Sequence, residues 1–382
     1  MSNILLLGGG LQTLSLARGL RRFGNAVYNI ADNRSVGKYS RYVDLFVGCS
    51  INELTDIFIV KFAKEHDINV IIPTEDEYAE WLSENKDSIQ AGCSVRCAVM
   101  SVDIFKRVIN KSLLMKECRL AGVPHPLTIP LMVNSLDEAA KAVGFPALIK
   151  PDVSNGSRGI CRVENIEQLK AKAPTILEEY GPCSLQEYIG NKHHYYNAML
   201  YRYADGTWGY AVVTKITRFY PIKGGSSSFC TTMENPRIVE ICQKLLTHLG
   251  WIGFADFDIL EKEDGDYRVI EINPRVPASL HAALASGIDF GQMIVDDMTC
   301  SPRRHMSYLP GEQLRFLGLD IAWFVSSPDR FRTSPSWFKF WGAHLHYQEG
   351  GIKDYRAMAY SLWNGIRKQL SPSFRKAKSG MN

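Results

Sequence analysis

Short apolar runs alternate with segments of helical spacing along the first part of the chain. Residues 11–24 and 56–67 carry apolar residues three or four apart, which is typical of amphipathic helices. The apolar runs that predict strands are 3–7, 26–32, 44–48 and 69–74. Strands that alternate with helices indicate βαβ units and a parallel sheet. The pattern therefore predicts an α/β domain over residues 1–100.

A mixed pattern of helices and strands follows as far as residue 300. Gly122 and the prolines after it predict the end of a helix over 101–122. Asp205-Gly206 and Asp264-Gly265 predict hairpin turns, and the polar residues 221–228 predict a loop. Further helices are expected at 136–144, 166–173 and 236–249. Further strands are expected at 146–150, 159–163, 184–189, 195–204, 208–217, 254–260 and 267–272.

The last segment, 301–382, is rich in aromatic residues and ends in a basic tail. The aromatic residues are Trp323, Trp337, Phe338, Phe340, Trp341 and Trp363, and the basic ones are Arg367, Lys368, Arg375, Lys376 and Lys378. Large aromatic side chains mostly mark cores, so we expect them to pack on the rest of the protein. An oligomer interface, a cover over the substrate side and contact with a membrane surface are the alternatives.

Composition narrows the class of protein. Of 382 residues, 46% are hydrophobic and 22% are charged, and the net charge is +4. These values exclude a disordered chain and a collagen, and the charge is too weak to indicate nucleic acid as a partner. No apolar stretch is long enough to cross a membrane, and the start of the chain does not resemble a signal peptide. Nine scattered cysteines suggest reduced thiols in the cytoplasm rather than a disulfide framework.

A glycine-rich turn, Gly8-Gly9-Gly10, separates the first strand from the first helix. Such a turn can bring backbone N–H groups to a phosphate, and Asp32 lies where an acid binds ribose in dinucleotide folds. Thr13 stands at the third glycine position of that motif, so the match is incomplete. The small residues alternatively serve only to pack the helix on the sheet.

Two lysines and a loop point to a polyphosphate site. Lys111 falls on a predicted helix, and Lys150 ends a predicted strand that leads at once into the Ser/Gly-rich loop 154–159. Loop N–H groups and a lysine ammonium are suited to phosphate oxygens. A simple hairpin loop is the alternative.

Three oxygen-bearing side chains follow downstream. Asp258 lies on one strand of a predicted hairpin, and Glu271 and Asn273 lie two apart on the other, so they share a face. Two carboxylates and an amide are ligands that Mg²⁺ prefers. A solvated acidic face is the alternative, but it fits poorly because these acids end apolar runs.

In this order, the motifs resemble the ATP-grasp superfamily. The glycine-rich first domain, Lys111, Lys150, SNGSRG, QEYI, Asp258 and EINPR (271–275) carry the resemblance over roughly residues 1–300. EINPR most resembles one ATP-binding half of the carbamoyl phosphate synthase large subunit and related carboxylate–amine ligases. The resemblance implies an α/β fold with a Rossmann-like domain at 1–100. It further implies an ATP-grasp domain at 101–300, with a lid at about 120–187 and a metal and nucleotide part at about 188–300.

The resemblance also implies the site. Nucleotide contacts would come from Lys111, Lys150, Ser154, Gly156, Ser157, Gly159, Glu187, Tyr188, Ile189 and His194. Asp258, Glu271 and Asn273 would hold one or two Mg²⁺ ions, with Mn²⁺ as a substitute. Arg275, Lys215 and Arg218 would face the phosphoryl group or the substrate.

One position departs from the family pattern. His194 stands where the family usually has a glutamate that holds the ribose, and an imidazole cannot accept from two hydroxyls as a carboxylate does. A nucleotide-binding regulatory module without turnover is therefore one alternative, and an NAD-dependent oxidoreductase built on Gly8–Gly10 is another. Thr74 and Glu75 are candidates for the substrate side, or they form an ordinary helix cap.

The chemistry that the resemblance implies is a ligation. ATP would phosphorylate a substrate carboxylate, and an amine would displace phosphate from the acyl phosphate. The expected partners are a small carboxylic acid and an amine, with no nucleic acid, and the protein is expected to be cytoplasmic and a possible homodimer.

Overall fold

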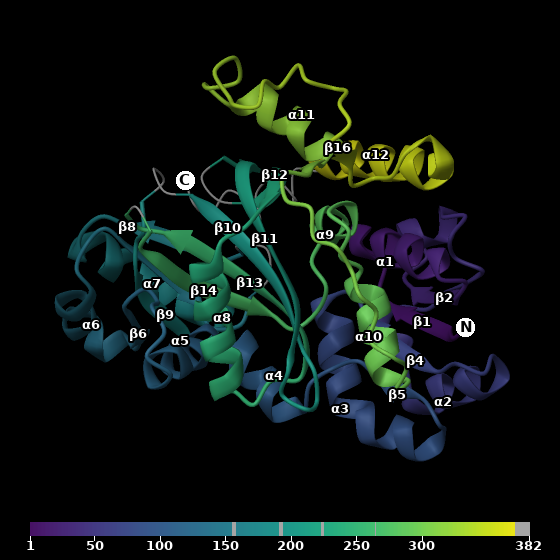
Figure 1. The fold of residues 1–382 in the computed structure, drawn as a ribbon. Coiled ribbons are helices and arrows are strands. Elements are labelled where there is room, and N and C mark those ends of the chain that lie inside the picture. The colour runs from purple at the N-terminus through teal and green to yellow at the C-terminus, as the bar shows by residue number, and fades with distance from the viewer. Residues whose placement is uncertain (155–157, 191–193, 223–224, 264, 371–382) are drawn as a thin grey trace.

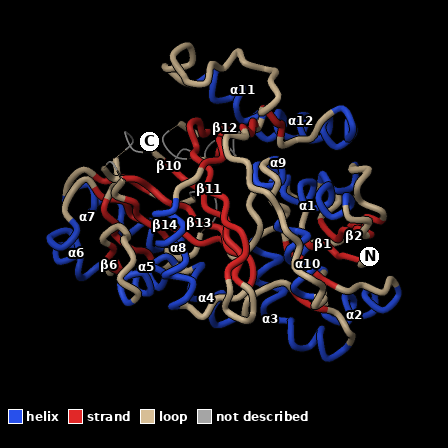
Figure 2. The backbone as a smooth tube through the Cα atoms, in the orientation of Figure 1, coloured by secondary structure: helices blue, strands red, loops and turns tan. Residues whose placement is uncertain are grey.

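The computed structural model describes residues 1–154, 158–190, 194–222, 225–263 and 265–370. Among these residues the strands form three sheets, and helices pack against each of them (Figures 1 and 2). The short 3₁₀ helices are η1 (Val36–Tyr39), η2 (Ile51–Glu53), η3 (Val133–Ser135) and η4 (Ile352–Asp354). The chain is thus a mixed α/β protein, as the sequence predicts.

The first sheet is parallel, with the strand order β3-β2-β1-β4-β5. Ile4 and Leu6 on β1 face one hydrophobic core, and Leu5 and Leu7 face another, so both faces of the sheet are covered. Its strands are β1 (Asn3–Leu7), β2 (Ala26–Ala31), β3 (Leu45–Gly48), β4 (Val70–Pro73) and β5 (Arg96–Cys97). Its helices are α1 (Leu11–Arg22), α2 (Asp56–Glu65) and α3 (Asp76–Gly92). The alternating pattern of strands and helices is confirmed.

A small antiparallel sheet follows, with the order β6-β9-β7-β8. Its strands are β6 (Thr128–Leu131), β7 (Ala147–Pro151), β8 (Cys161–Val163) and β9 (Cys183–Glu187). Helices α6 (Leu136–Val143) and α7 (Ile166–Tyr180) share a hydrophobic core with it. Two helices, α4 (Val102–Ile109) and α5 (Lys111–Leu120), precede it. The sequence predicts one helix here, but the side chain of Asn110 caps α5 by accepting from Leu113 N and so divides it.

The large sheet has the order β14-β13-β10-β11-β12-β15-β16. Its strands are β10 (Tyr195–Arg202), β11 (Trp208–Tyr220), β12 (Ser226–Met233), β13 (Gly253–Glu261), β14 (Tyr267–Asn273), β15 (Gln313–Arg315) and β16 (Leu345–Tyr347). The later helices are α8 (Pro236–His248), α9 (Leu280–Ala285), α10 (Phe290–Met298), α11 (Leu317–Ser326) and α12 (Tyr355–Leu370). Strands β15 and β16 come from the C-terminal segment, so this segment extends the sheet rather than standing apart from it.

Strand β12 differs from the predicted loop. Part of the polar stretch 221–228 forms the start of this strand, which pairs with β11 along most of its length. Serine and threonine hydroxyls are tolerated here because Ser228 and Thr232 are buried in the sheet and bonded to neighbouring groups. The polar composition of this stretch therefore led to the wrong prediction of a loop where a strand inside the large sheet begins.

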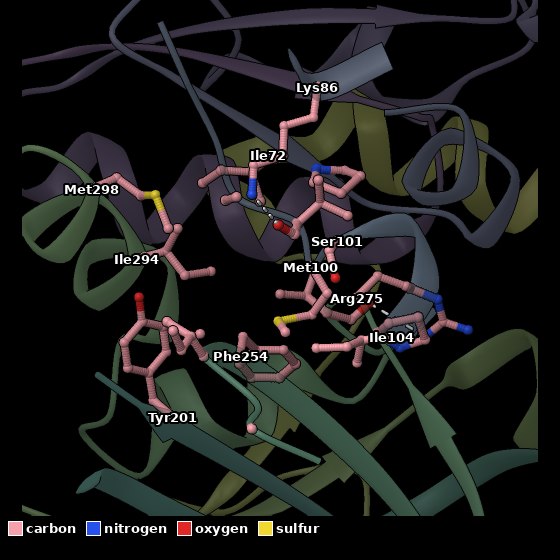
Figure 3. Close-up of a pocket in the computed structure, with 18 residues that line it drawn as sticks. Ile72, Lys86, Met100, Ser101, Ile104, Tyr201, Phe254, Arg275, Ile294 and Met298 are labelled. Atoms are coloured by element: carbon pink, nitrogen blue, oxygen red, sulfur yellow. Dashed lines mark hydrogen bonds between the residues drawn. The ribbon is translucent and has the colours of Figure 1, made fainter. Parts of the chain in front are cut away.

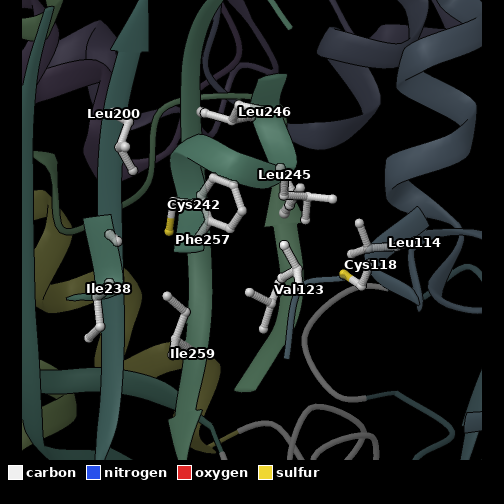
Figure 4. Close-up of a cluster of buried hydrophobic side chains, with 14 of the residues drawn as sticks. Leu114, Cys118, Val123, Leu200, Ile238, Cys242, Leu245, Leu246, Phe257 and Ile259 are labelled. Atoms are coloured by element: carbon white, nitrogen blue, oxygen red, sulfur yellow. The ribbon is translucent and has the colours of Figure 1, made fainter. Parts of the chain in front are cut away.

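A hydrophobic core fills one face of the large sheet. Side chains of β10, β13 and β14 pack there against α5 and α8, and Figure 4 shows Phe257 of β13 beside Cys242 and Leu245. Trp251 is fully buried beside them, and its indole N–H donates to Phe254 O at 3.1 Å. The opposite face of these strands is thereby left for polar side chains.

The aromatic C-terminal segment is only partly buried. Trp323 packs in the interior, whereas Trp341 is 85% exposed and Trp363 is 66% exposed. Figure 1 shows α11 lying above the edge of the large sheet and α12 lying next to α1. The expectation that these aromatics build a core holds for Trp323 but not for Trp341 and Trp363.

We expect Phe257→Ala to lower the free energy of unfolding by about 3–5 kcal/mol, because it leaves a cavity in a fully buried cluster. Denaturant unfolding followed by circular dichroism measures the change. Ile57→Ala is the control, since that side chain is 77% exposed and its removal should have little effect. Equal effects of the two substitutions would contradict this description of the core.

Candidate active site

Two neighbouring strands bring a set of oxygen-bearing side chains together. Asp256 lies opposite Asn273 across β13 and β14, and Asp258 lies opposite Glu271. Residues two apart on a strand share a face, so all four side chains reach one face of the sheet. They line a cleft of about 460 Å³. The predicted placement of Asp258 beside Glu271 and Asn273 is confirmed.

Asp256 is not among the site residues that the sequence predicts. Its carboxylate accepts from Asn197 Nδ2 at 2.5 Å and from Asn273 Nδ2 at 3.1 Å. Burial raises the pKa of Asp256 well above its ordinary value, and the neighbouring charge of Asp258 adds to the shift. Its spacing of two from Asp258 is the signal that could have revealed it. Asp256 orients the two amides rather than facing open space.

Asp258 and Glu271 face each other, so a negative charge on one makes a negative charge on the other less favourable. Burial, and then the charge of Glu271, raises the pKa of Asp258 from 3.8 to about 6. A divalent cation with oxygen ligands would relieve both effects, so this donor set fits Mg²⁺. In the part of the chain that the structure describes, no group of three or more His, Cys, Asp or Glu side chains is arranged to hold a metal. A cation here would therefore draw further ligands from water or phosphate.

Two lysines lie near Glu271, although neither of them lines the 460 Å³ cleft. Lys111 Nζ is 3.8 Å from Glu271 Oε1 and donates to the Ser154 carbonyl at 3.0 Å. Lys150 Nζ donates to Gln186 Oε1 at 2.5 Å. Burial, and then the positive charge of Lys111, lowers the pKa of Lys150 to about 8. Two buried ammonium groups that disfavour each other would be stabilised by an anion between them.

The glycine-rich loop is described at its two ends. Ser154 and Gly159 are included, while Gly156 and Ser157 lie outside the described residues. Gly159 has a φ of +72°, and a Cβ built there would lie 2.7 Å from Pro151 Cγ. The turn that ends the loop therefore requires glycine.

The predicted hinge lies where the small sheet meets the large one. Glu187 N donates to Leu127 O at 2.8 Å, and the Glu187 carboxylate is paired with Lys262. The Arg162 guanidinium lies 4.2 Å from the centre of the Tyr188 ring. Ile189 is buried. These contacts fix the hinge, and its role in reading adenine stays a prediction.

His194 lies beside a carboxylate that the sequence does not reveal. Its Nδ1 is 2.9 Å from Glu261 Oε2, which also accepts from the Tyr196 hydroxyl at 2.9 Å. Burial opposes the charge of Glu261, but hydrogen bonds from Gly265 N, Tyr196 and His194 hold its pKa below the ordinary value. A charged acid is thus present next to the histidine, 67 residues away in sequence.

Arg275 connects the large sheet to the first domain. Its Nε donates to Asp76 Oδ1 at 2.8 Å, and its Nη2 donates to Asp76 Oδ2 at 3.3 Å. Nη2 also lies 3.3 Å from Asn273 Oδ1 and donates to it. Asp76 was not predicted, because nothing local marks a partner 199 residues away. The pair places the start of α3 at the wall of the cleft.

A second cavity, of about 320 Å³, lies on the other side of Arg275. Figure 3 shows that its walls are mostly hydrophobic, with Ile72, Phe254 and Ile294 among them. Lys86 lies there too, and its Nζ donates to the Val99 carbonyl at 3.1 Å. The second cavity is not lined by Asp258 or Glu271, so the 460 Å³ cleft is the better candidate for an active site.

The glycine-rich turn of the first domain is not arranged as a dinucleotide site. Gly9 N donates to the Glu75 carboxylate at 2.9 Å, so an acid stands where a phosphate would have to bind. Asp32 is paired with Arg34 at 3.0 Å. Thr74 is fully buried and donates to Leu7 O. Glu75 and Thr74 therefore close the turn, and neither side chain makes the helix-capping hydrogen bond.

Two of the predicted catalytic residues lie elsewhere. Arg218 is fully buried, and its Nε donates to Asp320 Oδ1 at 2.7 Å, so it cannot contact a substrate. Lys215 pairs in register with Tyr196, and its Nζ is 6.0 Å from the centre of that ring. Because Tyr196 belongs to the core on the opposite face from Asp258, Lys215 points away from the cleft. The family resemblance implied a site role for both residues, but strand register and the buried pairing with Asp320 direct them elsewhere.

Comparison with known proteins agrees with this geometry. Residues 207–313 match a family described as "ATP-grasp in the biosynthetic pathway with Ter operon". D-aspartate ligase of Enterococcus faecium is 22% identical over 77% of this chain and 76% of its own length. The N-terminal section of a Methanopyrus kandleri carbamoyl phosphate synthase large chain is 28% identical. The match covers 43% of this chain and 31% of that section.

Solved structures show the same fold. The biotin carboxylase domain of 2-oxoglutarate carboxylase from Hydrogenobacter thermophilus, a dimer in complex with MgADP, ADP and bicarbonate, has a TM-score of 0.67. It is 16% identical and covers 82% of this chain and 73% of its own. The fold is that of the ATP-grasp class, and the match to an ATP-grasp family model over residues 207–313 agrees with it. Within that class it is a ligase, and the comparisons support neither the oxidoreductase nor the regulatory alternative.

At pH values well above 6, we expect Mg²⁺ to raise the thermal unfolding temperature of the protein. At pH values well below 6, we expect Mg²⁺ to have little effect on it. The raised pKa means that Asp258 keeps its proton to higher pH when folded than when unfolded, so stability falls as pH rises from 3.8 towards 6. A bound cation offsets that loss. Differential scanning fluorimetry with and without Mg²⁺ measures it, and an equal Mg²⁺ effect in Asp258→Asn would argue against the assignment.

We expect Asp320→Asn to lower the free energy of unfolding by about 3–5 kcal/mol. The substitution removes the charge that lies 2.7 Å from Arg218 Nε and 2.9 Å from Arg315 Nε, and all three side chains are fully buried. Denaturant unfolding measures the loss, with the exposed Asp329→Asn as control. A stable Asp320→Asn protein would show that the two arginines do not need this partner.

Proposed function

We propose that this ligase uses Mg²⁺ and ATP to activate a small carboxylic acid as an acyl phosphate, which an amine then attacks. The observation that carries the proposal is the cleft itself. Asp258 and Glu271 face each other across two strands, and Lys111 Nζ lies 3.8 Å from Glu271 Oε1, so a cation held by the acids would adjoin a polyphosphate held by the lysine. A substrate-side arginine, Arg275, lines the same cleft.

In the proposal, Asp258, Glu271 and Asn273 hold one or two Mg²⁺ ions, and Mn²⁺ could replace them. When bound, the metal neutralises charge on the β- and γ-phosphates. Asp256 keeps Asn273 in place by accepting from its Nδ2, which leaves Asn273 Oδ1 turned towards the cleft and Arg275. The roles of Asp258 and Glu271 rest on their register and on the cost of their facing charges.

The nucleotide would lie between the small and the large sheet. Lys111 and Lys150 bind phosphate oxygens, and ATP would restore the full charge of Lys150, whose pKa burial lowers to about 8. Ser154, Gly156, Ser157 and Gly159 close over the phosphates in this proposal. Glu187, Tyr188 and Ile189 read the adenine, and His194, backed by Glu261, reaches the ribose. The buried acid beside His194 would compensate for the missing family glutamate.

The substrate acid would bind where the first domain meets the cleft. Gln12, Asp76 and Ser279 line that end together with Arg275. The guanidinium of Arg275 is held by Asp76, and it would stabilise the negative charge that develops on the transferred phosphoryl group. Ser279 Oγ donates to Asn197 Oδ1 at 2.9 Å, which ties this end to the carboxylate cluster.

The chemistry would proceed in two displacements. The substrate carboxylate oxygen attacks the γ-phosphorus, the bond to the bridging oxygen breaks, and ADP leaves with that electron pair. The amine nitrogen then attacks the acyl carbon, phosphate leaves, and the amine proton passes to solvent or phosphate. The protein positions both partners and excludes water, so no side-chain nucleophile is needed.

Amino acids are the substrate class that we favour, since D-aspartate ligase matches most of the chain. A homodimer and a cytoplasmic site of action complete the proposal. All nine cysteines are free thiols, which suits a reducing compartment. No helix among the described residues is long and apolar enough to cross a membrane.

We expect ADP release from Mg-ATP to require both an acid and an amine, tested with panels of amino acids paired with amines. Glu271→Gln should reduce this turnover to background, because it removes a charge at the proposed metal site. Glu240→Gln, on the exposed face of α8, is the matched control and should retain full activity. A coupled assay for ADP provides the measurement.

Two results would contradict the proposal. One is ATP hydrolysis at the same rate with and without both substrates. The other is full ligase turnover in the Glu271→Gln protein, since the carboxylate cluster would then have no part in catalysis.

A further inference from the structure

A third cavity, of about 690 Å³, lies outside the ATP cleft. It is formed between α1, α9 and the C-terminal segment, where Figure 1 shows α12 lying next to α1. We call it the C-terminal cavity, and its walls include Arg18, His281, Trp341 and Glu349. Its size falls within the range of small-molecule sites. Most of it is built from residues beyond 313, where the match to the ATP-grasp family ends.

Two buried charges at this cavity lack a full set of partners. Arg18 is 8% exposed; its Nη1 donates to Gln348 O at 3.4 Å, and its Nη2 has no partner among the described residues. Glu349 is 4% exposed; its Oε1 accepts from Gly318 N at 3.2 Å, and its Oε2 has none among the same residues. Burying charge without pairing is costly, so each such group needs a physical explanation, and a bound ligand is one.

The cost of these charges is visible in their protonation. Burial lowers the pKa of Arg18, and burial raises the pKa of Glu349. The Arg18 guanidinium and the Glu349 carboxylate attract each other only at longer range than the hydrogen bonds given above. His281 adds a third polar atom, Nδ1, that is buried without a partner there. The charges of Asp354 and Glu349 attract Arg18 from a distance, yet Arg18 Nη2, Glu349 Oε2 and His281 Nδ1 keep no hydrogen-bond partner among the described residues.

Most of the remaining wall residues are apolar or aromatic, and Lys353 and Asp354 add one charge of each sign at the wall. Phe340, Trp341, Leu345, Met358 and Leu362 line the cavity, and Trp341 is 85% exposed at its edge. Such walls suit an apolar body, while one positive and one negative group suit a head that carries both charges. A ligand with only one charge would leave either Arg18 or Glu349 unpaired.

We propose that the C-terminal cavity is a second ligand site that binds a free α-amino acid with a large apolar side chain. The ligand carboxylate pairs with Arg18, the ammonium pairs with Glu349, and the side chain lies against Trp341 and Leu345. This site is independent of the proposed ligation chemistry.

A short glycine segment controls access to Arg18. Gly350 has a φ of +108°, and a Cβ built on it would lie 2.4 Å from Arg18 Nη2. The backbone therefore covers the guanidinium, and Gly351 follows directly. A ligand reaches Nη2 when this two-glycine segment shifts, which glycine permits because it has no side chain to move.

Helix α9 links the cavity to the ATP cleft. Ser279, just before the helix, donates to Asn197 in the carboxylate cluster, while His281 in its first turn lines the cavity. Leu317 lines the cavity, and the adjacent Phe316 lines the cleft. A ligand in the cavity would therefore contact elements that also build the cleft.

Isothermal titration of the full chain without ATP tests the proposal. The probes are L-phenylalanine, L-tryptophan and L-leucine, with 3-phenylpropionate and phenethylamine as analogues that each carry one charge. We expect at least one amino acid to bind about tenfold or more tightly than either analogue, because each analogue loses one charge-assisted bond. Arg18→Met should weaken amino-acid binding by a similar factor.

Arg22→Met, one turn further along α1 and exposed, is the matched control and should bind as the native chain does. Trp341→Ala removes an exposed side chain, so it should fold normally and still weaken binding several-fold. Failure of all three amino acids to bind would overturn the proposal, as would equal binding of either analogue. Binding that survives in Trp341→Ala but is lost in Glu271→Gln would place the ligand in the ATP cleft instead and would also overturn it.

Discussion

Repulsion between two facing carboxylates is the constraint around which this molecule is arranged. Asp258 and Glu271 are brought together by strand register, and both are half-buried against the sheet. Neutral amides and a lysine surround the pair, and the hydrophobic core occupies the other face of the same strands. Part of the repulsion between the two carboxylates remains uncompensated, and this remainder favours binding of a cation. A cluster whose charges were fully compensated would gain little from a cation.

The first domain takes part in the site through one ion pair. Asp76 at the start of α3 accepts from one edge of the Arg275 guanidinium with both of its carboxylate oxygens, and Arg275 in turn donates to Asn273. A shift of the parallel sheet relative to the large sheet would therefore move a wall of the cleft. The glycine-rich turn, which resembles a nucleotide motif, instead serves to seat the Glu75 carboxylate beside β1.

Features that depend on spacing within a strand could be predicted, and features that depend on distant partners could not. The two-residue spacing of Glu271 and Asn273 placed them on one face, and the same spacing before Asp258 could have revealed Asp256. Asp76 and the buried partner of Arg218 lie 199 and 102 residues from the arginines they bind. The polar start of β12 was predicted as a loop. The sequence does not show that its hydroxyl groups form hydrogen bonds inside the sheet, which is what allows a strand there.

The edge of the large sheet gives the C-terminal segment one more part to play. Strand β12 would be an outer strand without β15, which pairs with it at Phe229–Thr231 and is itself covered by β16. An open edge offers unpaired N–H and C=O groups to any other extended chain, which is a common route to aggregation. By adding two short strands there, the segment that forms the C-terminal cavity also protects the large sheet from unwanted strand pairing.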